Sequence, residues 1–115
     1  MAYTTIDDGS EYFNTVLWTG DASSDKSISG VGFQPDWVWI KRRGTTGGNM
    51  LTDSIRGVTK TIITNETGAE QTFANGLTAF GTDGFTVGNY SETNTNSENY
   101  VSWNWKAGTS VSGPI

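Results

Sequence analysis

The chain has 115 residues, the length of one domain, and contains neither cysteine nor histidine. This composition excludes disulfide bonds, thiolate nucleophiles, Cys/His metal sites and a Ser-His-Asp triad, so we expect neither a cofactor-dependent nor a histidine-based enzyme. The net charge of −5 argues against a nucleic-acid-binding protein, because such a protein needs a basic surface.

Apolar residues account for only 34% of the chain, but five Trp, five Phe and four Tyr are among them. Each large ring can bury about 150–250 Å². We therefore expect a thin core built from rings, and the aromatic content excludes a disordered chain. No run approaches the roughly 18 apolar residues of a membrane-spanning helix, and the first residues lack the pattern of a signal peptide.

Turn-forming residues recur between β-branched and aromatic runs roughly every 8–12 residues, which is the pattern of an all-β sandwich or barrel. The first clear strand covers residues 12–19 and places Tyr12, Val16 and Trp18 on one face. The second clear strand covers residues 36–43 and has apolar side chains on both faces. Such a strand is either covered on both sides or meets a ligand or partner with one face.

The last clear strand covers residues 99–106 and shows the cleanest alternation in the chain. Trp103 and Trp105 share one face, and Ser102 and Asn104 lie on the other. The alternation predicts a half-buried strand whose tryptophans face the interior.

The remaining signals are shorter. A hairpin is predicted over residues 77–80 and 85–87, with Gly84 in the left-handed conformation at its turn. Weaker strands are expected at residues 27–32, 50–52, 60–64 and 70–74. So many strands favour a two-sheet antiparallel β-sandwich of the jelly-roll type over a small five-stranded barrel. The best helical candidate is a single turn at residues 53–55.

We expect one domain over residues 1–106. The tail at residues 107–115 is rich in Gly, Ser and Thr and is typical of a flexible linker to a further segment. Polar loops at residues 20–26, 44–49 and 90–98 are long enough to carry binding specificity.

Two tryptophan pairs, Trp37 with Trp39 and Trp103 with Trp105, are candidates for a platform on which sugar rings stack. The alternative is that these rings fill the space between two sheets. We favour the second interpretation because all four lie in the middle of strands, and for the same reason we place Trp18 in the core.

A basic segment, Lys41-Arg42-Arg43, closes the second strand, in a middle region that is basic although the chain is acidic overall. It can contact an anionic polysaccharide or an acidic patch on a neighbouring subunit. The simpler interpretation is a solvated strand end that pairs with the acidic flanks. The ligand-binding candidates are thus Trp37, Trp39, Lys41, Arg42 and Arg43.

Acidic residues provide two further candidates. Asp7, Asp8, Asp21, Asp25 and Asp83 lie among Gly, Ser and Asn, the oxygen-rich setting of calcium sites, but turn formation explains them more simply and we predict no metal site. A glycosidase needs two carboxylates across a cleft, one with a raised pKa. The available candidates, Glu66, Glu70, Glu92 and Glu98, all lie in polar stretches that we expect to be exposed, so we predict no enzyme activity.

Several segments, in this order, resemble a domain found in virion proteins of tailed phages, especially marine phages. They are AYTTIDD (residues 2–8), VLWTG (16–20), GFQPDWVWIKRR (32–43), DSIRG (53–57), NGLT (75–78), DGFTVG (83–88) and WNWKAG (103–108). The resemblance covers nearly the whole chain, and residues 32–43 are its most specific part.

The resemblance implies a lectin-like, concanavalin-type β-sandwich that is repeated along tail fibres or other structural proteins. It implies no activity and no catalytic residue. We accordingly expect a non-enzymatic module of a fibre, spike or head-surface protein, located in the virion, for assembly or host-surface adhesion. Its expected partners are sibling virion subunits, with a homo-oligomer such as a trimer, and host-surface glycans. The alternative is a free-standing carbohydrate-binding lectin domain.

Overall fold

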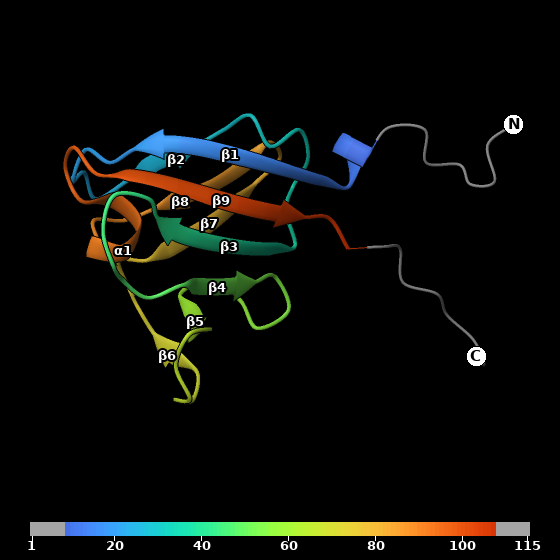
Figure 1. Cartoon of the computed structure of the whole chain (residues 1–115). Coiled ribbons are helices and arrows are strands. Elements are labelled where there is room, and N and C mark those ends of the chain that lie inside the picture. The colour runs from blue at the N-terminus through green and yellow to red at the C-terminus, as the bar shows by residue number, and fades with distance from the viewer. Residues whose placement is uncertain (1–8, 108–115) are drawn as a thin grey trace, which may run out of the picture.

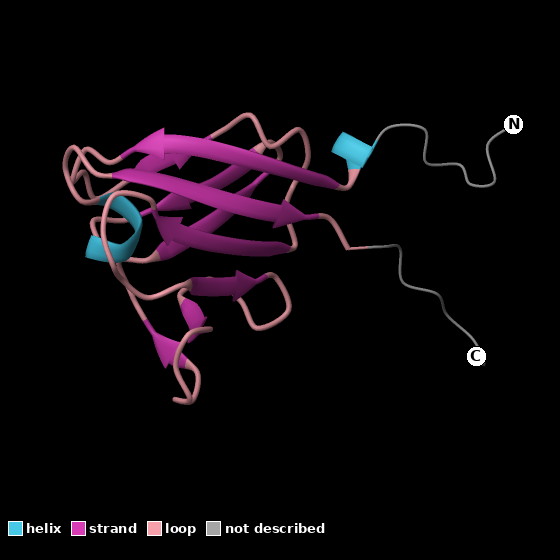
Figure 2. Ribbon diagram, in the orientation of Figure 1, coloured by secondary structure: helices cyan, strands magenta, loops and turns pink. Residues whose placement is uncertain are grey.

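Nine strands in two antiparallel sheets make up most of the regular structure of residues 9–107, the part of the chain that this computed structural model describes (Figures 1 and 2). A six-stranded sheet has the order β1-β9-β3-β4-β5-β6, and a three-stranded sheet with the order β2-β8-β7 lies behind it. The two-sheet antiparallel β-sandwich predicted from the sequence is therefore confirmed.

The strands of the larger sheet are β1 (Phe13–Thr19), β9 (Asn99–Trp105), β3 (Trp37–Arg42), β4 (Met50–Asp53), β5 (Lys60–Ile63) and β6 (Gln71–Thr72). Those of the smaller sheet are β2 (Lys26–Ile28), β8 (Gly84–Val87) and β7 (Leu77–Gly81). Two short helices, η1 (Gly9–Glu11) and α1 (Ser91–Asn94), complete the described elements. No helix within residues 9–107 is long and apolar enough to cross a membrane.

The core lies between the two sheets. Val38, Ile40 and Tyr100 from the larger sheet meet Phe85 and Val87 from the smaller one, and all five are buried. Burying such side chains is the main favourable contribution to the stability of a small sandwich.

Trp18 closes the core beside α1, as the sequence predicted. Its ring stacks on Tyr100 at a centroid distance of 5.5 Å and meets Phe85 edge-on at 5.8 Å. Its indole N–H donates a hydrogen bond to the carbonyl oxygen of Thr93 at 3.1 Å, so the polar end of this half-buried ring is also satisfied.

One local prediction is confirmed and another is wrong. The chain makes a single hydrogen-bonded turn after Asp53, in which the backbone N–H of Gly57 donates to the carbonyl oxygen of Asp53 at 3.0 Å, as in one turn of a helix. The Asp53 carboxylate also accepts hydrogen bonds from the backbone N–H groups of Ile55 and Arg56, which is the turn chemistry of an aspartate. Gly84 does not adopt the left-handed conformation, because it is the first residue of β8 and pairs with Gly81. Glycine is needed there for another reason: a Cβ would run into the carbonyl oxygen of Ile28.

The predicted strand at residues 27–32 also ends early, at Ile28, because the following loop needs positive φ angles at Gly30 and Gly32. The first and last described strands are neighbours, and the backbone N–H of Lys106 donates to the carbonyl oxygen of Tyr12 at 2.8 Å. The predicted linker at residues 107–115 lies outside the described residues apart from Ala107.

Tyr100 offers a test of this core. Its hydroxyl donates to the carbonyl oxygen of Ser91 and accepts the backbone N–H of Thr95, both at 2.7 Å. Tyr100→Phe should lower the free energy of unfolding by about 1–3 kcal/mol, because the half-buried backbone N–H of Thr95 loses this acceptor and the carbonyl oxygen of Ser91 keeps only the Thr95 hydroxyl as a side-chain donor. Urea unfolding measures this, with Tyr12→Phe on an exposed ring as the control. Equal stability of the two variants would contradict the assignment.

Candidate functional site

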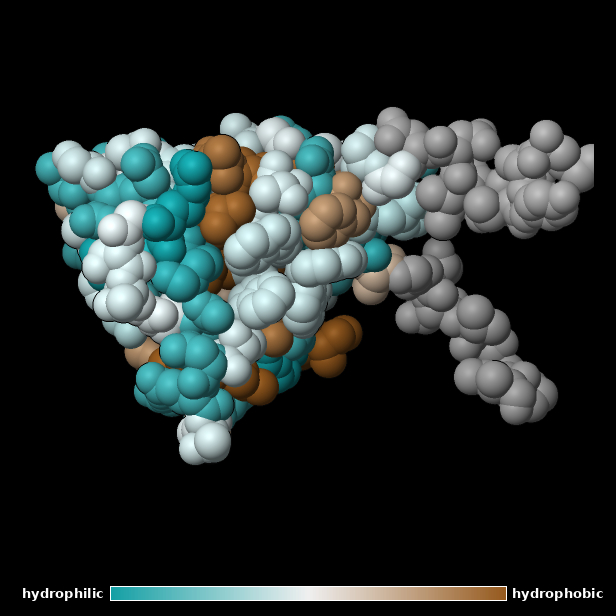
Figure 3. Space-filling model, viewed as in Figure 1, coloured by the Kyte–Doolittle hydropathy of each residue, from teal (hydrophilic) through white to brown (hydrophobic). Residues whose placement is uncertain are grey.

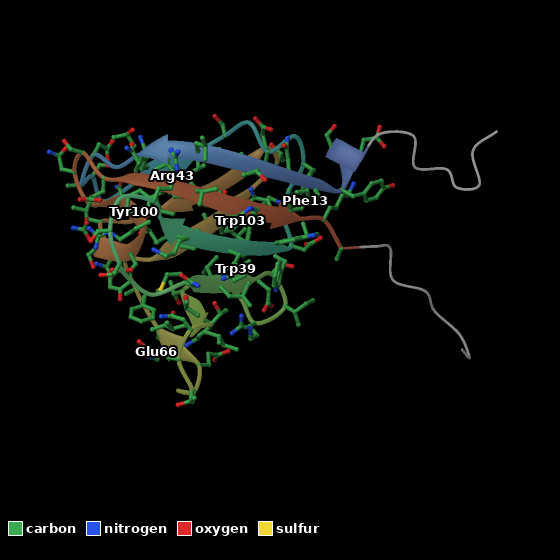
Figure 4. All side chains as sticks on the ribbon, in the orientation of Figure 1. Phe13, Trp39, Arg43, Glu66, Tyr100 and Trp103 are labelled. Atoms are coloured by element: carbon green, nitrogen blue, oxygen red, sulfur yellow. The ribbon has the colours of Figure 1, made fainter. Side chains whose placement is uncertain are left out.

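An aromatic surface covers the outer side of the six-stranded sheet. Phe13 of β1, Trp105 and Trp103 of β9, and Trp37 and Trp39 of β3 all project away from the smaller sheet. Figure 4 shows Phe13, Trp103 and Trp39 on this side, which faces the viewer. We call the outer side of β1, β9, β3 and β4 the aromatic face.

Strand register arranges these side chains in rows across the sheet. One row is Phe13, Trp105, Trp37 and Asp53; the next is Thr15, Trp103, Trp39 and Leu51; the third is Leu17, Val101 and Lys41. The face therefore has two rows that carry aromatic rings and one that carries smaller or more flexible side chains.

The rings contact one another continuously. Centroid distances are 4.7 Å for Phe13–Trp105, 4.2 Å for Trp37–Trp105, 6.0 Å for Trp37–Trp39 and 5.4 Å for Trp39–Trp103. Tilted and edge-on ring pairs of this kind each contribute about 0.5–1.5 kcal/mol beyond the area they bury. The Trp39 indole N–H also donates to the Thr64 hydroxyl at 3.0 Å. The rings thus form a pre-ordered surface.

The prediction that these four tryptophans fill the space between the sheets is wrong. Ser102 and Asn104 occupy the interior instead, and both are 0% exposed. They lie on the same side of β9 as Tyr100, which is fixed in the core, so the two-residue period of a strand turns Trp103 and Trp105 outward.

Hydrogen bonds within the interior offset part of the cost of burying the Ser102 and Asn104 side chains. The Asn104 amide nitrogen donates to the Ser102 hydroxyl at 2.9 Å and to the carbonyl oxygen of Asn14 at 3.1 Å. Buried polar groups are tolerated when they are paired in this way. The pairing is partial, because the Asn104 amide oxygen has no hydrogen-bond partner among the described residues.

Few charges interrupt the aromatic face. Among the outward side chains of β1, β9, β3 and β4, only Lys41 and Asp53 are ionisable, and the rows place them at opposite ends. Leu17 is 57% exposed and Phe13 is 38% exposed. Figure 3 shows this side of the molecule as a pale and brown band, with hydrophilic surface beside it towards α1.

A hollow of about 440 Å³ lies at the Trp37 end of the face. Trp37, Trp105 and Ile55 line it together with the polar side chains of Asp36, Asp53 and Ser54. The Asp36 carboxylate accepts the Ser54 hydroxyl at 2.9 Å and the backbone N–H of Ala107 at 2.8 Å. Burial raises the pKa of Asp53, but hydrogen bonds and the charge of Arg56 outweigh it and lower that pKa below its ordinary value. The hollow is therefore aromatic on one side and lined by two carboxylates on the other, of which Asp53 is paired with Arg56.

The structure separates the three basic candidates. Lys41 lies on the aromatic face, where its ammonium donates to the carbonyl oxygens of Arg42 at 2.7 Å and Thr45 at 3.1 Å. Arg43 is exposed beyond the end of β3. Arg42 points away from the face and is only 16% exposed. These residues do not form one basic patch.

Arg42 is held by two glutamates. Its guanidinium lies 3.3 Å from a Glu92 carboxylate oxygen and 3.7 Å from one of Glu98. The prediction that Glu92 is exposed is wrong, because its side chain is only 14% exposed. Gly47 makes this possible, since a Cβ there would collide with the Glu92 carboxylate. The other predicted carboxylates lie apart: Glu70 pairs with Arg56 at 3.4 Å, and Glu66 is exposed.

The predicted calcium candidates are engaged in turns where they are described. Asp21 accepts the backbone N–H of Ser23 and the amide of Asn94, and Asp83 accepts the backbone N–H groups of Gly30 and Gly32. Asp25 is exposed, whereas Asp7 and Asp8 lie outside the described residues. Within residues 9–107 no three acidic side chains gather as a metal site would require.

Sequence reasoning named both tryptophan pairs as candidates for a platform but favoured the core for all four rings, and it did not single out Phe13. Local alternation showed which rings share a face but not which face points inward. The available signal was the position of Tyr100, a large ring on the Ser102 side of β9.

A family profile with the description "Domain of unknown function (DUF7483)" matches residues 8–114, so the chain belongs to this family. Comparison with curated proteins and comparison with solved structures each found no match.

The outward position of Trp103 predicts a modest effect on stability. Trp103→Ala should lower the free energy of unfolding by about 1–2 kcal/mol, because the ring is half-buried against its neighbour Trp39. Trp18→Ala removes a ring that packs on the core and should cost about 3–5 kcal/mol. Equal losses in chemical denaturation would contradict the outward placement.

Asp83 predicts a pH dependence. Hydrogen bonds from the backbone N–H groups of Gly30 and Gly32 lower its pKa. The ionised form is thus favoured in the folded state, so this stabilisation is complete above the unfolded pKa of about 4 and is lost as the pH falls through the lower folded value. Asp83→Asn should be less stable than the parent at pH 7, and the difference should shrink below about pH 4 in urea unfolding. A difference that does not depend on pH would refute this role.

Proposed function

We propose that this DUF7483 domain is a non-enzymatic module of a phage virion protein, a fibre, spike or head-surface protein, and that it provides a binding surface for assembly or host adhesion. The virion setting rests on the sequence resemblance. The binding role rests on one observation, the outward-facing aromatic face of the six-stranded sheet, in which Phe13 is exposed and the four tryptophans are half-buried.

Soluble domains rarely leave large contiguous apolar patches in water unless the patch is a binding site. Here five rings lie together on the outer side of three strands and hold one another in place. Aromatic residues that are rigid before binding lose little conformational entropy when a partner covers them. A partner can therefore dock on this surface without rearranging it.

The acidic side chains argue for binding rather than hydrolysis. A glycosidase needs two free carboxylates that face each other across a cleft. In the described residues Glu92 and Glu98 share Arg42, and Glu70 pairs with Arg56. Asp36 and Asp53 lie beside the hollow, but both are engaged: the Asp36 carboxylate accepts hydrogen bonds from Ser54 and Ala107, and the Asp53 carboxylate accepts them from its own turn and pairs with Arg56.

A free-standing carbohydrate-binding domain is the second candidate, and the hollow favours it. Its volume of about 440 Å³ lies within the usual range of roughly 300–1,000 Å³ for small-ligand sites. Indole rings at Trp37 and Trp105 can stack on the C–H faces of a sugar, while the carboxylates of Asp36 and Asp53 can accept its hydroxyl groups.

Locating the chain in purified particles tests the proposal. An antibody against the folded domain should label intact virions of the phage that encodes it, and mass spectrometry should find the chain at a fixed copy number per particle. Abundant chain in the infected-cell lysate together with none in the particles would overturn the proposal.

Tryptophan fluorescence separates the two candidates. If the free-standing lectin is correct, soluble polysaccharides should change the emission of the parent protein, Trp37→Ala should abolish the response, and Leu17→Ala should keep it. Leu17 is the matched control because it lies on the same face at the end away from the hollow. No response across a broad panel would eliminate the lectin.

A further inference from the structure

The two outer rows of the aromatic face are complementary to each other in size. Its row of Phe13, Trp105 and Trp37 carries large rings, and two residues further along the strands its row of Leu17, Val101 and Lys41 carries smaller or flexible side chains. If a second copy is turned by a two-fold rotation about an axis that lies in the face and runs across the strands, the two rows exchange places. Large side chains of one copy then meet small ones of the other, and the middle rows with Trp103 and Trp39 meet each other.

The same rotation also places a basic side chain of one copy near acidic side chains of the other. The rotation brings Lys41 of one copy over Trp37 of the other, at the edge of the hollow that contains Asp36 and Asp53. Asp53 is already paired with Arg56 of its own copy, so Asp36 is the carboxylate without an ion-pair partner among the described residues. An ammonium group is attracted both to an indole face and to carboxylates. Within one copy, Lys41 bonds only to backbone carbonyl oxygens and pairs with no carboxylate of the described residues, so its charge is available to a partner.

We propose that two copies of this chain associate through their aromatic faces about such a two-fold axis, with Lys41 of each copy entering the hollow beside Trp37 of the other. This inference rests on the proposed function and specifies its partner as a second copy. An interface of this kind is isologous, because the same patch of surface serves both subunits.

The size of the face agrees with a modest dimer. Strands β1, β9, β3 and β4 have seven, seven, six and four residues. With about 4.8 Å between strands and about 3.4 Å per residue they cover roughly 390 Å² in projection. Two such faces bury about 800 Å², and more with the relief of their side chains, which is the size of a weak, transient interface. We therefore expect association in the micromolar range, which depends on protein concentration.

Sedimentation velocity between about 1 μM and 0.5 mM tests the proposal with the full chain. The parent should convert from monomer to dimer with rising concentration. Leu17→Glu places a carboxylate in the apolar contact and should raise the dissociation constant at least about tenfold. Ala79→Glu is the matched control, since it adds the same charge at an exposed position of β7 in the other sheet, and it should behave as the parent.

Lys41 variants test whether Lys41 of each copy enters the hollow of the other. Lys41→Glu brings a carboxylate to Asp36 and Asp53 of the partner and should abolish the dimer, whereas Lys41→Arg should keep it. Circular dichroism and urea unfolding verify that each variant is folded. A parent that stays monomeric throughout, or a dimer that Leu17→Glu and Lys41→Glu leave unchanged, overturns the inference.

The outcomes separate this inference from the proposed function. A monomer found in virions and bound to another virion protein would overturn the pairing and leave the proposed function standing. A monomer whose fluorescence responds to polysaccharides would assign the face to a sugar and also overturn the pairing. A dimer that is absent from particles would keep the pairing and overturn the virion role.

Discussion

The position of Tyr100 determines which side of the larger sheet is the interior. Its ring is fully buried against Trp18, and its hydroxyl is fixed by Ser91 and Thr95. Because side chains alternate along a strand, this single anchor sends Ser102 and Asn104 inward and both tryptophans of β9 outward. A shift by one residue would bury the tryptophans but would leave the tyrosine and its two hydrogen bonds in solvent.

A polar interior at this position is compatible with a stable sandwich because it is small and the amide nitrogen of Asn104 is hydrogen-bonded within it. Ser102 lies between Val16 and Ile40 on the neighbouring strands, so apolar groups flank it on both sides. Asn104 bonds to Ser102 and to the backbone of β1, which connects two strands through the interior. The core therefore contains few aliphatic side chains. Of the five tryptophans only Trp18 packs against it, and the other four lie on the aromatic face.

Local sequence patterns predicted the strands well and their orientation less well. The ends of β1, β3 and β9 lie within one residue of the predicted ones, since each is a β-branched or aromatic run bounded by turn residues. The inward side of β9 depends on contacts with α1 and the smaller sheet, which alternation within one strand does not contain. The burial of Glu92 depends likewise on Arg42 and Gly47, 50 and 45 positions away. The hollow joins residues of three separate segments, so no local spacing indicates it.

The edge strand β1 of the larger sheet, like the aromatic face, is consistent with the proposed binding role. Proteins protect exposed edge strands with charged residues or proline, because unpaired backbone groups invite another strand. β1 is such an edge, and its seven residues include no charge and no proline. Its outward side chains, Phe13 and Leu17, extend the aromatic face to this edge. Charged residues make up 17% of the chain, but none of them lies in β1. This distribution agrees with the proposed contact of this surface with a partner.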